Sequence, residues 1–543
     1  MNLLNDSWIP VLREDGSSDT ISPLDLLDDS KENPVVEIHT VRPDFDSAVL
    51  QFLIGLYQVL LSPEDEDDWR DLLDEPPTRS DLSSKIDVLS SAFSFDDGEF
   101  RFMQDASVKD ASVKKTDTRE IQKLLLDIDN TLFLKDGSIR HLCPRCAAMA
   151  LLTLQLNAPS GGRGHRTSLR GGGPVTTLVC LPSGKGTLWQ NICLNIIPED
   201  MFPSQDNASV SAESLSSIFP WLGVVPNSEN GETALPDDYH PYHVYWNIPR
   251  RIFLDFASTK TGACDVCGAQ SERLLSSYWS RPKGMNYDSS LWRHPLTPYY
   301  RETNNKFLLP LHPKENTLSY ANWAGLIFGS ASKGRNPAAV VQTASSLLRT
   351  DAEFSDLKIH VSGYVTDQAK VRAWVEGRLP LITIPDSVKE AFETEISQIM
   401  DTASWAGKLL LLKVKQGLPV LSKEKQELTG KPGLFKGDIP SITSSFWNKT
   451  EPAFQQVLSR LPDVLMSGSE EQLFELKRNW LSEIRRISLG IFSEWVSYPV
   501  YGELNPACAA KAEWELSVSL LPSNAKICND LGLPAPEKKK KVK

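Results

Sequence analysis

Residues 139–157 read IRHLCPRCAAMALLTLQLN, a stretch in which two cysteines stand immediately before a long apolar run. The run after Cys146 is rich in Ala, Met and Leu, which favour helix, and contains no glycine or proline. It is followed by Ala158-Pro159, and the residue before a proline is disfavoured in a helix. The sequence therefore predicts a loop that carries the cysteine pair into a helix ending near residue 157.

A second cysteine pair, CDVC at 264–267, has the same two-residue spacing as CPRC at 143–146. Two such pairs supply the four thiolates of a structural Zn²⁺ site, because a tight turn lets both sulfurs of a pair reach one ion. The 117 residues between the pairs exceed zinc-finger spacing, so the metal would clasp two distant segments. We expect structural zinc here, with unpaired core thiols as the alternative. The expected ligands are Cys143, Cys146, Cys264 and Cys267.

The composition, 41% hydrophobic and 23% charged over 543 residues, is ordinary for a soluble globular protein. The sequence shows neither a membrane-spanning apolar run nor a signal-peptide pattern, and we expect a cytoplasmic protein that contacts no membrane. The net charge of −13 is uneven, since residues 1–100 contain 24 Asp and Glu against 6 Lys and Arg. Nucleic-acid binders are usually basic, so nucleic-acid contact would depend on a local patch or a larger assembly.

The expected fold class is α+β. Two β-branched segments, PVTTLVCLP at 174–182 and TLWQNICLNII at 187–197, are typical of strands. Beyond Pro385 four segments have helical periodicity, and the clearest places apolar residues three or four apart from Leu473 to Trp495. We expect a large mixed N-terminal domain with the four-cysteine zinc clasp (1–380), a C-terminal four-helix bundle (381–535) and a cationic tail (536–543).

A glycine- and arginine-rich stretch, SGGRGHRTSLRGGG at 160–173, follows the first predicted helix. Glycines allow close backbone approach to a phosphate or groove edge, although an inert surface loop is the alternative. The motifs of common enzymes are missing: SGKGT at 183–187 departs from the P-loop pattern, and neither GxSxG nor HExxH occurs. We find no catalytic constellation and expect a protein that is not an enzyme.

Several phrases together resemble one family. They are the opening MNLLNDSWIPV, the CPRC and CDVCG pairs, NAPSGGRGHRTSLRGGGPVTT, SLWRHPLTP and SGYVTDQA, in the same order over nearly the whole chain. The sequence resembles the CasA family, the large subunit of the type I-E CRISPR Cascade complex. The resemblance implies a non-catalytic subunit for antiviral defence that recognises the protospacer-adjacent motif in double-stranded DNA through the minor groove, helps open the duplex and recruits a helicase-nuclease. Its implied partners are the other Cascade subunits, the CRISPR guide RNA and the target DNA.

The resemblance also implies roles for individual positions. The loop that lies against the motif duplex falls on Ser160, Gly161, Gly162, Arg163 and Gly164. The family's minor-groove lysine falls on Lys283, and the glutamine that splits the first base pair falls on Gln368. The segment that docks on the 5′ handle of the guide RNA contains Phe133 and Lys135.

Two positions depart from the family pattern. Arg163 stands where a loop glycine is expected, and Asp367 stands where the pattern has asparagine. A carboxylate accepts hydrogen bonds only, for instance from the guanine N2 amino group, so we expect an altered motif preference. Two other function classes stay open at this point: a zinc-dependent nucleic-acid enzyme, disfavoured because four thiolates leave no open metal position, and a pure scaffold.

Overall fold

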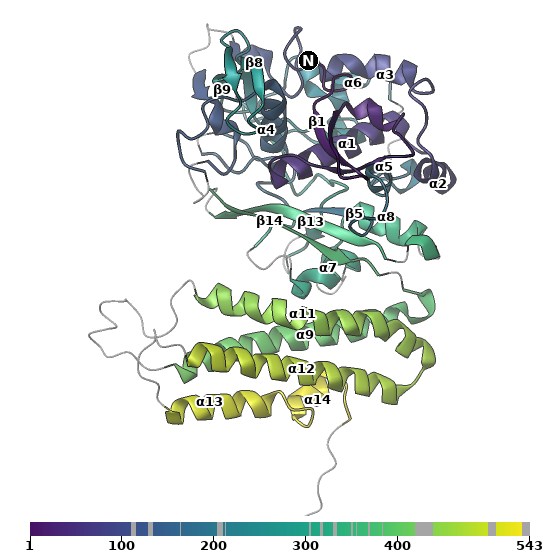
Figure 1. Ribbon diagram of the computed structural model, residues 1–543, viewed down its shortest axis with the longest axis vertical. Coiled ribbons are helices and arrows are strands. Elements are labelled where there is room, and N and C mark those ends of the chain that lie inside the picture. The colour runs from purple at the N-terminus through teal and green to yellow at the C-terminus, as the bar shows by residue number, and fades with distance from the viewer. Residues whose placement is uncertain are drawn as a thin grey trace, which may run out of the picture. The chain divides into compact units, whose positions relative to one another are not determined.

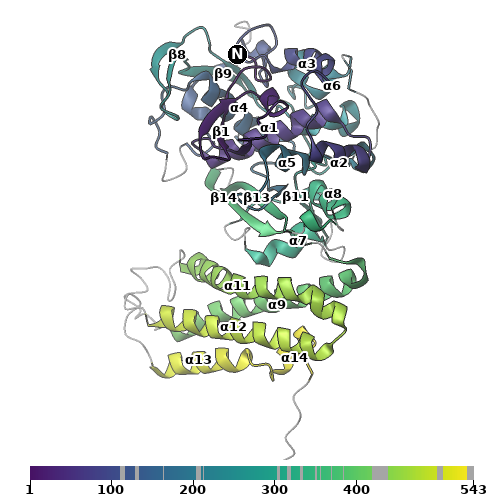
Figure 2. The same cartoon turned by 45° about the vertical axis from the view of Figure 1, so that its right-hand side comes forward.

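The chain folds into two compact units, residues 1–314 with 329–381 and residues 315–328 with 382–543 (Figures 1 and 2). The structure is a computed structural model. It describes residues 1–109, 116–128, 134–162, 164–203, 210–211, 213–302, 306–314, 319–329, 334–348, 351–354, 356–367, 370–382, 384–418, 438–497 and 506–534.

The first unit mixes helices with small antiparallel sheets, as expected for an α+β fold. Its helices are α1 (Pro43–Leu61), α2 (Glu66–Asp74), α3 (Ser83–Leu89), α4 (Pro144–Asn157), α5 (Leu188–Cys193), α6 (Leu215–Ile218) and α8 (Ala339–Leu347). Its strands are β1 (Ile9–Arg13), β2 (Ser18–Ile21), β3 (Val35–Ile38), β4 (Asp117–Glu120), β5 (Thr176–Cys180), β6 (Arg251–Leu254), β7 (Lys260–Ala263), β8 (Gln270–Leu274), β9 (Ser277–Arg281), β10 (Tyr299–Tyr300), β11 (Leu309–Pro310), β12 (Arg335–Asn336), β13 (Lys358–Asp367) and β14 (Lys370–Pro380).

Helix α1 forms the centre of this unit and packs against α4. The ring of Phe52 on α1 meets four aromatic rings edge-on, with centroids 5.4 to 5.7 Å away; these belong to Trp8, Phe93, Phe102 and Trp246. Among the described residues, α1 is the one helix long and apolar enough to cross a membrane, and 83% of that apolar window is buried inside the protein. Its hydrophobicity is therefore accounted for by the core.

Three of the sheets position the residues singled out in the sequence. β9 lies between β4 and β6, and its last residue is Arg281, two positions before Lys283. β13 lies between β14 and β5, and the β13–β14 hairpin pairs Asp367 with Lys370. β7 and β8 form a separate hairpin around the second cysteine pair. Gln368, which falls between β13 and β14 in the sequence, lies outside the described residues.

The two predicted strands after the glycine-rich stretch differ in outcome. Residues 176–180 form β5, as predicted, but the strand predicted over 187–197 is wrong, because α5 begins there. The Thr187 side chain accepts from the Gln190 backbone N–H, and the Gln190 side chain accepts from the Thr187 N–H. This capping box satisfies two backbone donors and favours a helix start over the β-propensity of the segment.

The second unit is a helical bundle. Figures 1 and 2 show its four long helices running alongside one another. They are α9 (Asp386–Gly417), α11 (Asp438–Ser467), α12 (Glu470–Val496) and α13 (Pro506–Ser519), and the short α14 (Ala525–Leu531) packs on α9. The periodic face of α12 is buried from Leu476 to Ile491, which accounts for the spacing seen in the sequence.

Residues 315–328, which the sequence analysis left in the first domain, group with the helices of the second unit. They include α7 (Trp323–Ile327). Tyr320 stacks on Phe454 of α11 with ring centroids 4.3 Å apart, and its hydroxyl lies 2.9 Å from the Thr450 hydroxyl. Trp323 is fully buried and packs edge-on against the same Phe454 ring. Burial of these aromatic rings explains why the segment belongs to the bundle despite its position in the sequence.

Candidate functional site

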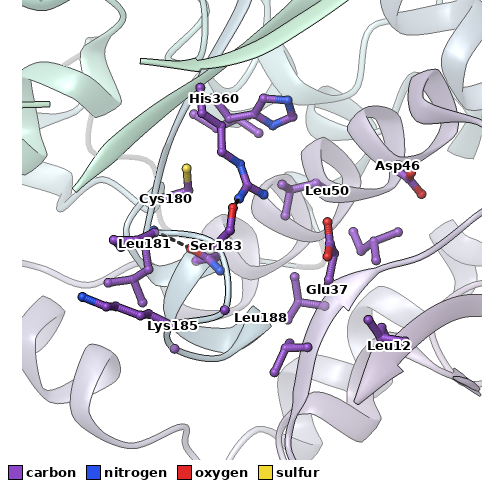
Figure 3. A pocket seen from close by; sticks show the side chains of 18 of the residues that line it. Leu12, Glu37, Asp46, Leu50, Cys180, Leu181, Ser183, Lys185, Leu188 and His360 are labelled. Carbon is purple, nitrogen blue, oxygen red and sulfur yellow. Dashed lines mark hydrogen bonds between the residues drawn. The ribbon is translucent and has the colours of Figure 1, made fainter. Parts of the chain in front are cut away.

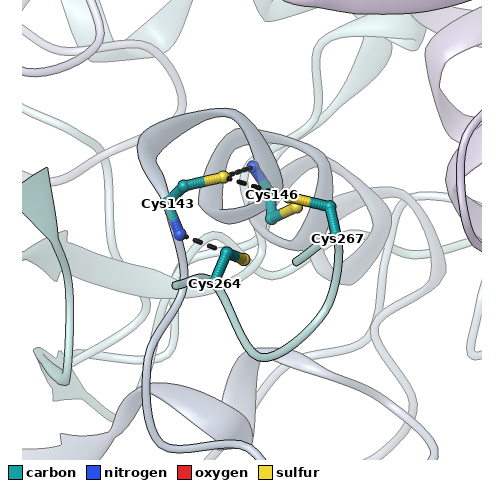
Figure 4. Close-up of side chains that lie close together, drawn as sticks. All are labelled: Cys143, Cys146, Cys264 and Cys267. Atoms are coloured by element: carbon teal, nitrogen blue, oxygen red, sulfur yellow. Dashed lines mark hydrogen bonds between the residues drawn. The ribbon is translucent and has the colours of Figure 1, made fainter. Parts of the chain in front are cut away.

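The four cysteines predicted as metal ligands come together. Cys143 is the N-cap of α4 and Cys146 lies in its first turn, whereas Cys264 and Cys267 lie in the turn between β7 and β8. Their four sulfurs all lie within 4.8 Å of one another (Figure 4). The distance between the Cys143 and Cys267 sulfurs is 3.7 Å. Tetrahedral Zn–S bonds of about 2.3 Å place their sulfurs ~3.8 Å apart, so the four side chains fit one metal ion.

Hydrogen-bond donors around the cluster favour ionised sulfur. The Cys143 backbone N–H lies 3.4 Å from the Cys264 sulfur, and the Arg145 guanidinium lies 3.7 Å from the Cys267 sulfur. Hydrogen bonds from Cys143 and Cys146 lower the pKa of the Cys264 thiol, and one from Cys146 lowers the pKa of Cys267 to about 5. The pKa values of Cys143 and Cys146 are raised, that of Cys146 chiefly by its hydrogen bonds to the other three thiols. Ionised sulfur is therefore favoured at Cys264 and Cys267 in the turn between β7 and β8, and a metal bound by all four residues requires the thiolate form of Cys143 and Cys146 as well.

The first part of the glycine-rich stretch forms what we call the glycine loop, residues 160–164, of which Arg163 lies outside the described residues. Ser160, Gly161 and Gly162 are exposed. The carbonyl oxygen of Gly164 accepts a hydrogen bond from the backbone N–H of Lys283 at 2.7 Å. A Cβ on Gly164 would lie 3.1 Å from Cγ of Lys283. The structure therefore brings together the loop and the lysine that the sequence analysis assigned to one surface.

Lys283 is held in a conformation that lysine rarely adopts. Its φ is +62°, in the left-handed region, and it is one of three non-glycine residues of the described chain with a positive φ. Its carbonyl accepts from the Ser228 N–H at 3.0 Å, and its Nζ donates to the Glu229 carbonyl at 2.9 Å. Contacts at both the backbone and the ammonium group fix the direction in which this side chain leaves the chain.

Three basic side chains whose grouping was not predicted from the sequence lie beside the glycine loop. The Arg250 guanidinium donates to the Pro159 carbonyl, and the Arg119 guanidinium lies 3.3 Å from Nε2 of His165. Burial and the charges of Arg250 and Arg119 lower the pKa of His165 to about 4, so its ring is neutral at pH 7. Nε of Arg119 and Nε of Arg250 are buried without a hydrogen-bond partner. We call Arg119, His165 and Arg250 the basic cluster.

The positive charge of the basic cluster is weakly compensated. Among the described carboxylates, Asp117 lies 3.8 Å from the Arg119 guanidinium, and its side chain is 67% exposed. Burial lowers the pKa of Arg250 to about 10, which leaves it charged at neutral pH. The sequence separates these residues by up to 131 positions, so no local pattern could have grouped them.

The second part of the glycine-rich stretch has a packing role. Gly171, Gly172 and Gly173 form a tight turn, which we call the glycine turn. A Cβ on Gly172 would lie 2.7 Å from the Pro159 Cα, and one on Gly173 would lie 2.8 Å from the Tyr364 carbonyl oxygen. Because Tyr364 belongs to β13 and precedes Asp367 by three residues, the glycine turn packs against the part of the hairpin that carries Asp367. The glycine-rich stretch therefore consists of two structurally different parts, an exposed loop and a packed turn.

Asp367 forms an ion pair with Arg372 on the opposite strand of the hairpin, with 2.9 Å between oxygen and nitrogen. Both side chains are about half exposed, at 59% and 49%. An exposed pair of this kind contributes little to stability, about 0 to 1 kcal/mol, but it partly neutralises the carboxylate. The hairpin thus presents a paired rather than a bare negative charge next to position 368.

Of the two residues assigned to the guide-RNA handle, one lies within the described part of the chain. Phe133 lies outside the described residues, whereas Lys135 is exposed. The neighbouring Asp136 accepts from the Gln122 side-chain amide at 2.8 Å and forms an ion pair with Lys123 at 3.4 Å. These contacts fix the turn that carries Lys135.

A separate pocket, with a volume of about 420 Å³, lies between β1, β3, α1, β5 and the loop 183–186 (Figure 3). Its lining includes three basic and three acidic side chains: Arg13, Lys185, Arg378, Glu14, Glu37 and Asp46. Burial raises the pKa of Asp46 to about 6. The three positive and three negative charges of this pocket balance, so it has no preference for a polyanion. In this respect it differs from the surface around Lys283.

Comparison with known proteins identifies one family and one fold. The family model for CRISPR-associated protein Cse1 matches residues 2–491. The structure of Thermus thermophilus CasA is similar with a TM-score of 0.68 and 18% identity, covering 96% of this chain and 99% of that one. Cse1 from Acidimicrobium ferrooxidans gives a TM-score of 0.64 and 14% identity, covering 99% of both chains. A chain of a CRISPR RNA-guided surveillance complex gives 0.68 and 14%, covering 96% of this chain and 99% of that one.

We predict that the two parts of the glycine-rich stretch tolerate alanine differently. Gly173→Ala adds a left-handed penalty, since φ is +63°, and a clash with the Tyr364 carbonyl, and should lower the free energy of unfolding by about 3 kcal/mol. Gly162 also has a positive φ, +67°, but nothing lies within 4 Å of its Cβ position, so Gly162→Ala should cost only about 1 kcal/mol. Urea unfolding of the full chain measures both, and equal losses would contradict the packing role.

Proposed function

The chain belongs to the CRISPR-associated Cse1 family, and on that premise we propose that it is the non-catalytic large subunit of a Cascade surveillance complex that reads the motif beside a DNA target. In this role it contacts double-stranded DNA through the minor groove and helps to open the duplex for guide-RNA pairing. The remaining proposed partners are the other Cascade subunits, the guide RNA and the helicase-nuclease that acts in antiviral defence.

The observation that carries this proposal is the contact between the glycine loop and Lys283 beside a weakly compensated basic cluster. Adenine N3 and thymine O2 in the minor groove accept hydrogen bonds, which an ammonium group donates. Exposed glycines let a backbone come close to the groove edge, and arginines nearby attract the phosphates. A single lysine and a backbone loop distinguish base pairs weakly, which suits tolerance of several motifs.

Duplex opening is assigned to Gln368 at the tip of the β13–β14 hairpin. A side chain inserted into the base stack unstacks one step at an energy of a few kcal/mol, which guide-RNA pairing offsets. The anchoring of β13 by the glycine turn supports this role, because a wedge must be held rigidly to do work on the duplex. Phe133 and Lys135 are proposed to contact the 5′ handle of the guide RNA.

The metal of the four-cysteine cluster is proposed to be a structural Zn²⁺. Four thiolate ligands complete a tetrahedral shell, so no position remains for a water or substrate. This argues against the alternative of a zinc-dependent nucleic-acid enzyme. The pure-scaffold alternative is tested by measuring duplex binding after substitution of Lys283 and Gln368.

We predict that Lys283→Ala with Gln368→Ala weakens binding of the assembled complex to a target duplex by roughly 100-fold at fixed salt, or about 2.7 kcal/mol. The same variant should bind a bubbled target, already unpaired beside the motif, within a few fold of the unmodified protein. Lys260→Ala with Gln270→Ala, both exposed on the β7–β8 hairpin, is the matched control and should bind both targets normally. Normal duplex binding by the Lys283 and Gln368 variant would favour the scaffold.

We predict that the purified full chain holds about one zinc ion and has neither nuclease nor ATPase activity. Cys264→Ser should release the metal and destabilise the first unit by several kcal/mol, on the order of 5, because metal binding is coupled to folding. Cys508→Ser changes an exposed cysteine outside the cluster and serves as the control. Metal analysis with thermal unfolding checks this; a metal-free chain of unchanged stability would indicate plain thiols, and metal-dependent nuclease activity would indicate an enzyme.

We predict that Asp367→Asn changes which motifs are accepted. Asparagine restores a donor toward adenine N3 or thymine O2, whereas the carboxylate of Asp367 can only accept, as from guanine N2. The variant should therefore bind A·T-containing motifs more tightly, by about 1 to 3 kcal/mol for a gained contact. A screen of target binding over a motif library measures this, and identical preferences for both proteins would remove Asp367 from the readout.

A further inference from the structure

A second basic site lies at the β4–β9–β6 sheet, whose central strand β9 ends two residues before Lys283. A pocket of about 240 Å³, which we call the Arg101 pocket, is lined by Asp96, Arg101, Lys109, Leu254, Asp255, Phe256, Ala257, Arg273 and Trp279. Trp279 lies on β9 and pairs with Phe253 of the adjacent β6. The pocket therefore combines three basic side chains with aromatic rings from the β4–β9–β6 sheet and the residues that follow it.

Of the two acidic residues of the pocket, Asp96 is paired with a cation, whereas Asp255 is bonded to uncharged donors only. Asp96 forms an ion pair with Arg273 at 2.6 Å, and its side chain is only 2% exposed. Asp255 accepts from the Ala257 backbone N–H at 3.2 Å and from the Ser277 hydroxyl at 3.4 Å. In the part of the chain that the structure describes, no carboxylate lies within ion-pair distance of Arg101 or Lys109.

Arg101 and Lys109 are held close to one another without such a partner. The Arg101 guanidinium carbon lies 4.6 Å from the centroid of the Phe253 ring, and the Lys109 ammonium lies 4.1 Å from the same centroid. Nε of Arg101 is buried and has no hydrogen-bond partner. Burial lowers the pKa of both groups, and the neighbouring Arg101 charge lowers that of Lys109 further, while the charges of Asp96 and Asp97 act to raise the pKa of Arg101 and that of Asp255 acts to raise the pKa of Lys109. Two like charges in this arrangement are stabilised by an anion placed between them.

The pocket is near Lys283 along the chain. Trp279 precedes Lys283 by four residues, so their Cα atoms are at most about 14 Å apart. Phosphates of one strand of B-DNA advance about 3.4 Å per nucleotide along the helix axis, so this separation covers at most about four nucleotides. The distance from one lining residue of the Arg101 pocket to Lys283 is therefore one that a few nucleotides of a single strand can span.

We propose that the Arg101 pocket binds a backbone phosphate of the nucleic acid that the complex holds near Lys283. Arg101 and Lys109 supply charge-assisted hydrogen bonds to the phosphate oxygens. The half-buried rings of Phe256 and Trp279 offer apolar and stacking contact to the adjoining sugar or base. This inference rests on the proposed function, since it takes Lys283 to face nucleic acid.

The test compares Arg101→Gln with Lys109→Gln, made together, against the unmodified protein in the assembled complex. Binding of a motif-containing DNA duplex is measured between 50 and 300 mM KCl. Each lost phosphate contact reduces the slope of log K against log salt by about 0.9 for B-DNA, so we expect a shallower slope by about 1. Lys31→Gln with Lys260→Gln removes the same charge from two exposed lysines and should leave the slope unchanged.

A second arm identifies the source of the phosphate. Association of guide RNA with the complex is measured over the same salt range, and a shallower slope there but not with duplex assigns the phosphate to the guide. If the slope of log K against log salt is unchanged both for the duplex and for the guide RNA, the proposal is overturned. This holds even if calorimetry shows that inorganic phosphate alone binds the pocket. Lys109→Gln alone changes an exposed side chain and therefore repeats the test without disturbing folding. Arg101→Lys keeps the positive charge and should give the same slope as the unmodified protein.

The outcome is separable from that of the proposed function. If Lys283→Ala leaves duplex binding unchanged while the Arg101 pocket variant gives the shallower slope, the minor-groove role fails and the phosphate site stands. If Lys283→Ala weakens binding while the pocket variant behaves like the unmodified protein, the proposed function stands and the phosphate site is withdrawn.

Discussion

The convergence of four sulfurs from two distant turns is the constraint on which the rest of the first unit depends. A metal ion bound by these four sulfurs would fasten the start of α4 to the turn between β7 and β8, and so close a segment of more than one hundred residues. The glycine loop, the glycine turn, β5 and Arg250 all lie within that segment, and Lys283 follows it closely. Closing a long loop removes much of the freedom of the unfolded chain. The cluster therefore fixes the relative positions of the candidate interface residues.

Positive charge is concentrated at particular sites of the first unit, although the chain as a whole is acidic. The chain has a net charge of −13, yet the basic cluster and the Arg101 pocket lie next to few free carboxylates. A buried arginine without a carboxylate is unfavourable in the free protein, because part of its hydration is lost without full compensation. An external anion would offset this cost, which is the physical link between the two proposed nucleic-acid contacts.

The sequence predicted the parts of the structure that have local or chemical signatures. The cysteine spacing predicted the cluster, and the periodicity around Trp480 predicted the buried face of α12. The fold class followed from the β-branched and periodic segments, and the Cse1 relationship followed from phrases spread over the chain. The packing of Tyr320 and Trp323 on α11 was missed, because aromatic residues in a short segment do not reveal which core they enter. The basic cluster was missed because its members meet only through the fold.

The contacts of Lys283 limit how its side chain can contribute to DNA recognition. Its ammonium group donates to the Glu229 carbonyl in the free protein, so a new bond in a groove exchanges one hydrogen bond for another. Such an exchange is worth only about 1 kcal/mol net. In the proposed function Lys283 would therefore set register and preference, while phosphate contacts from the arginines would supply most of the affinity. Because phosphate contacts are independent of sequence, a subunit built this way binds many duplexes weakly and holds those that the guide can open.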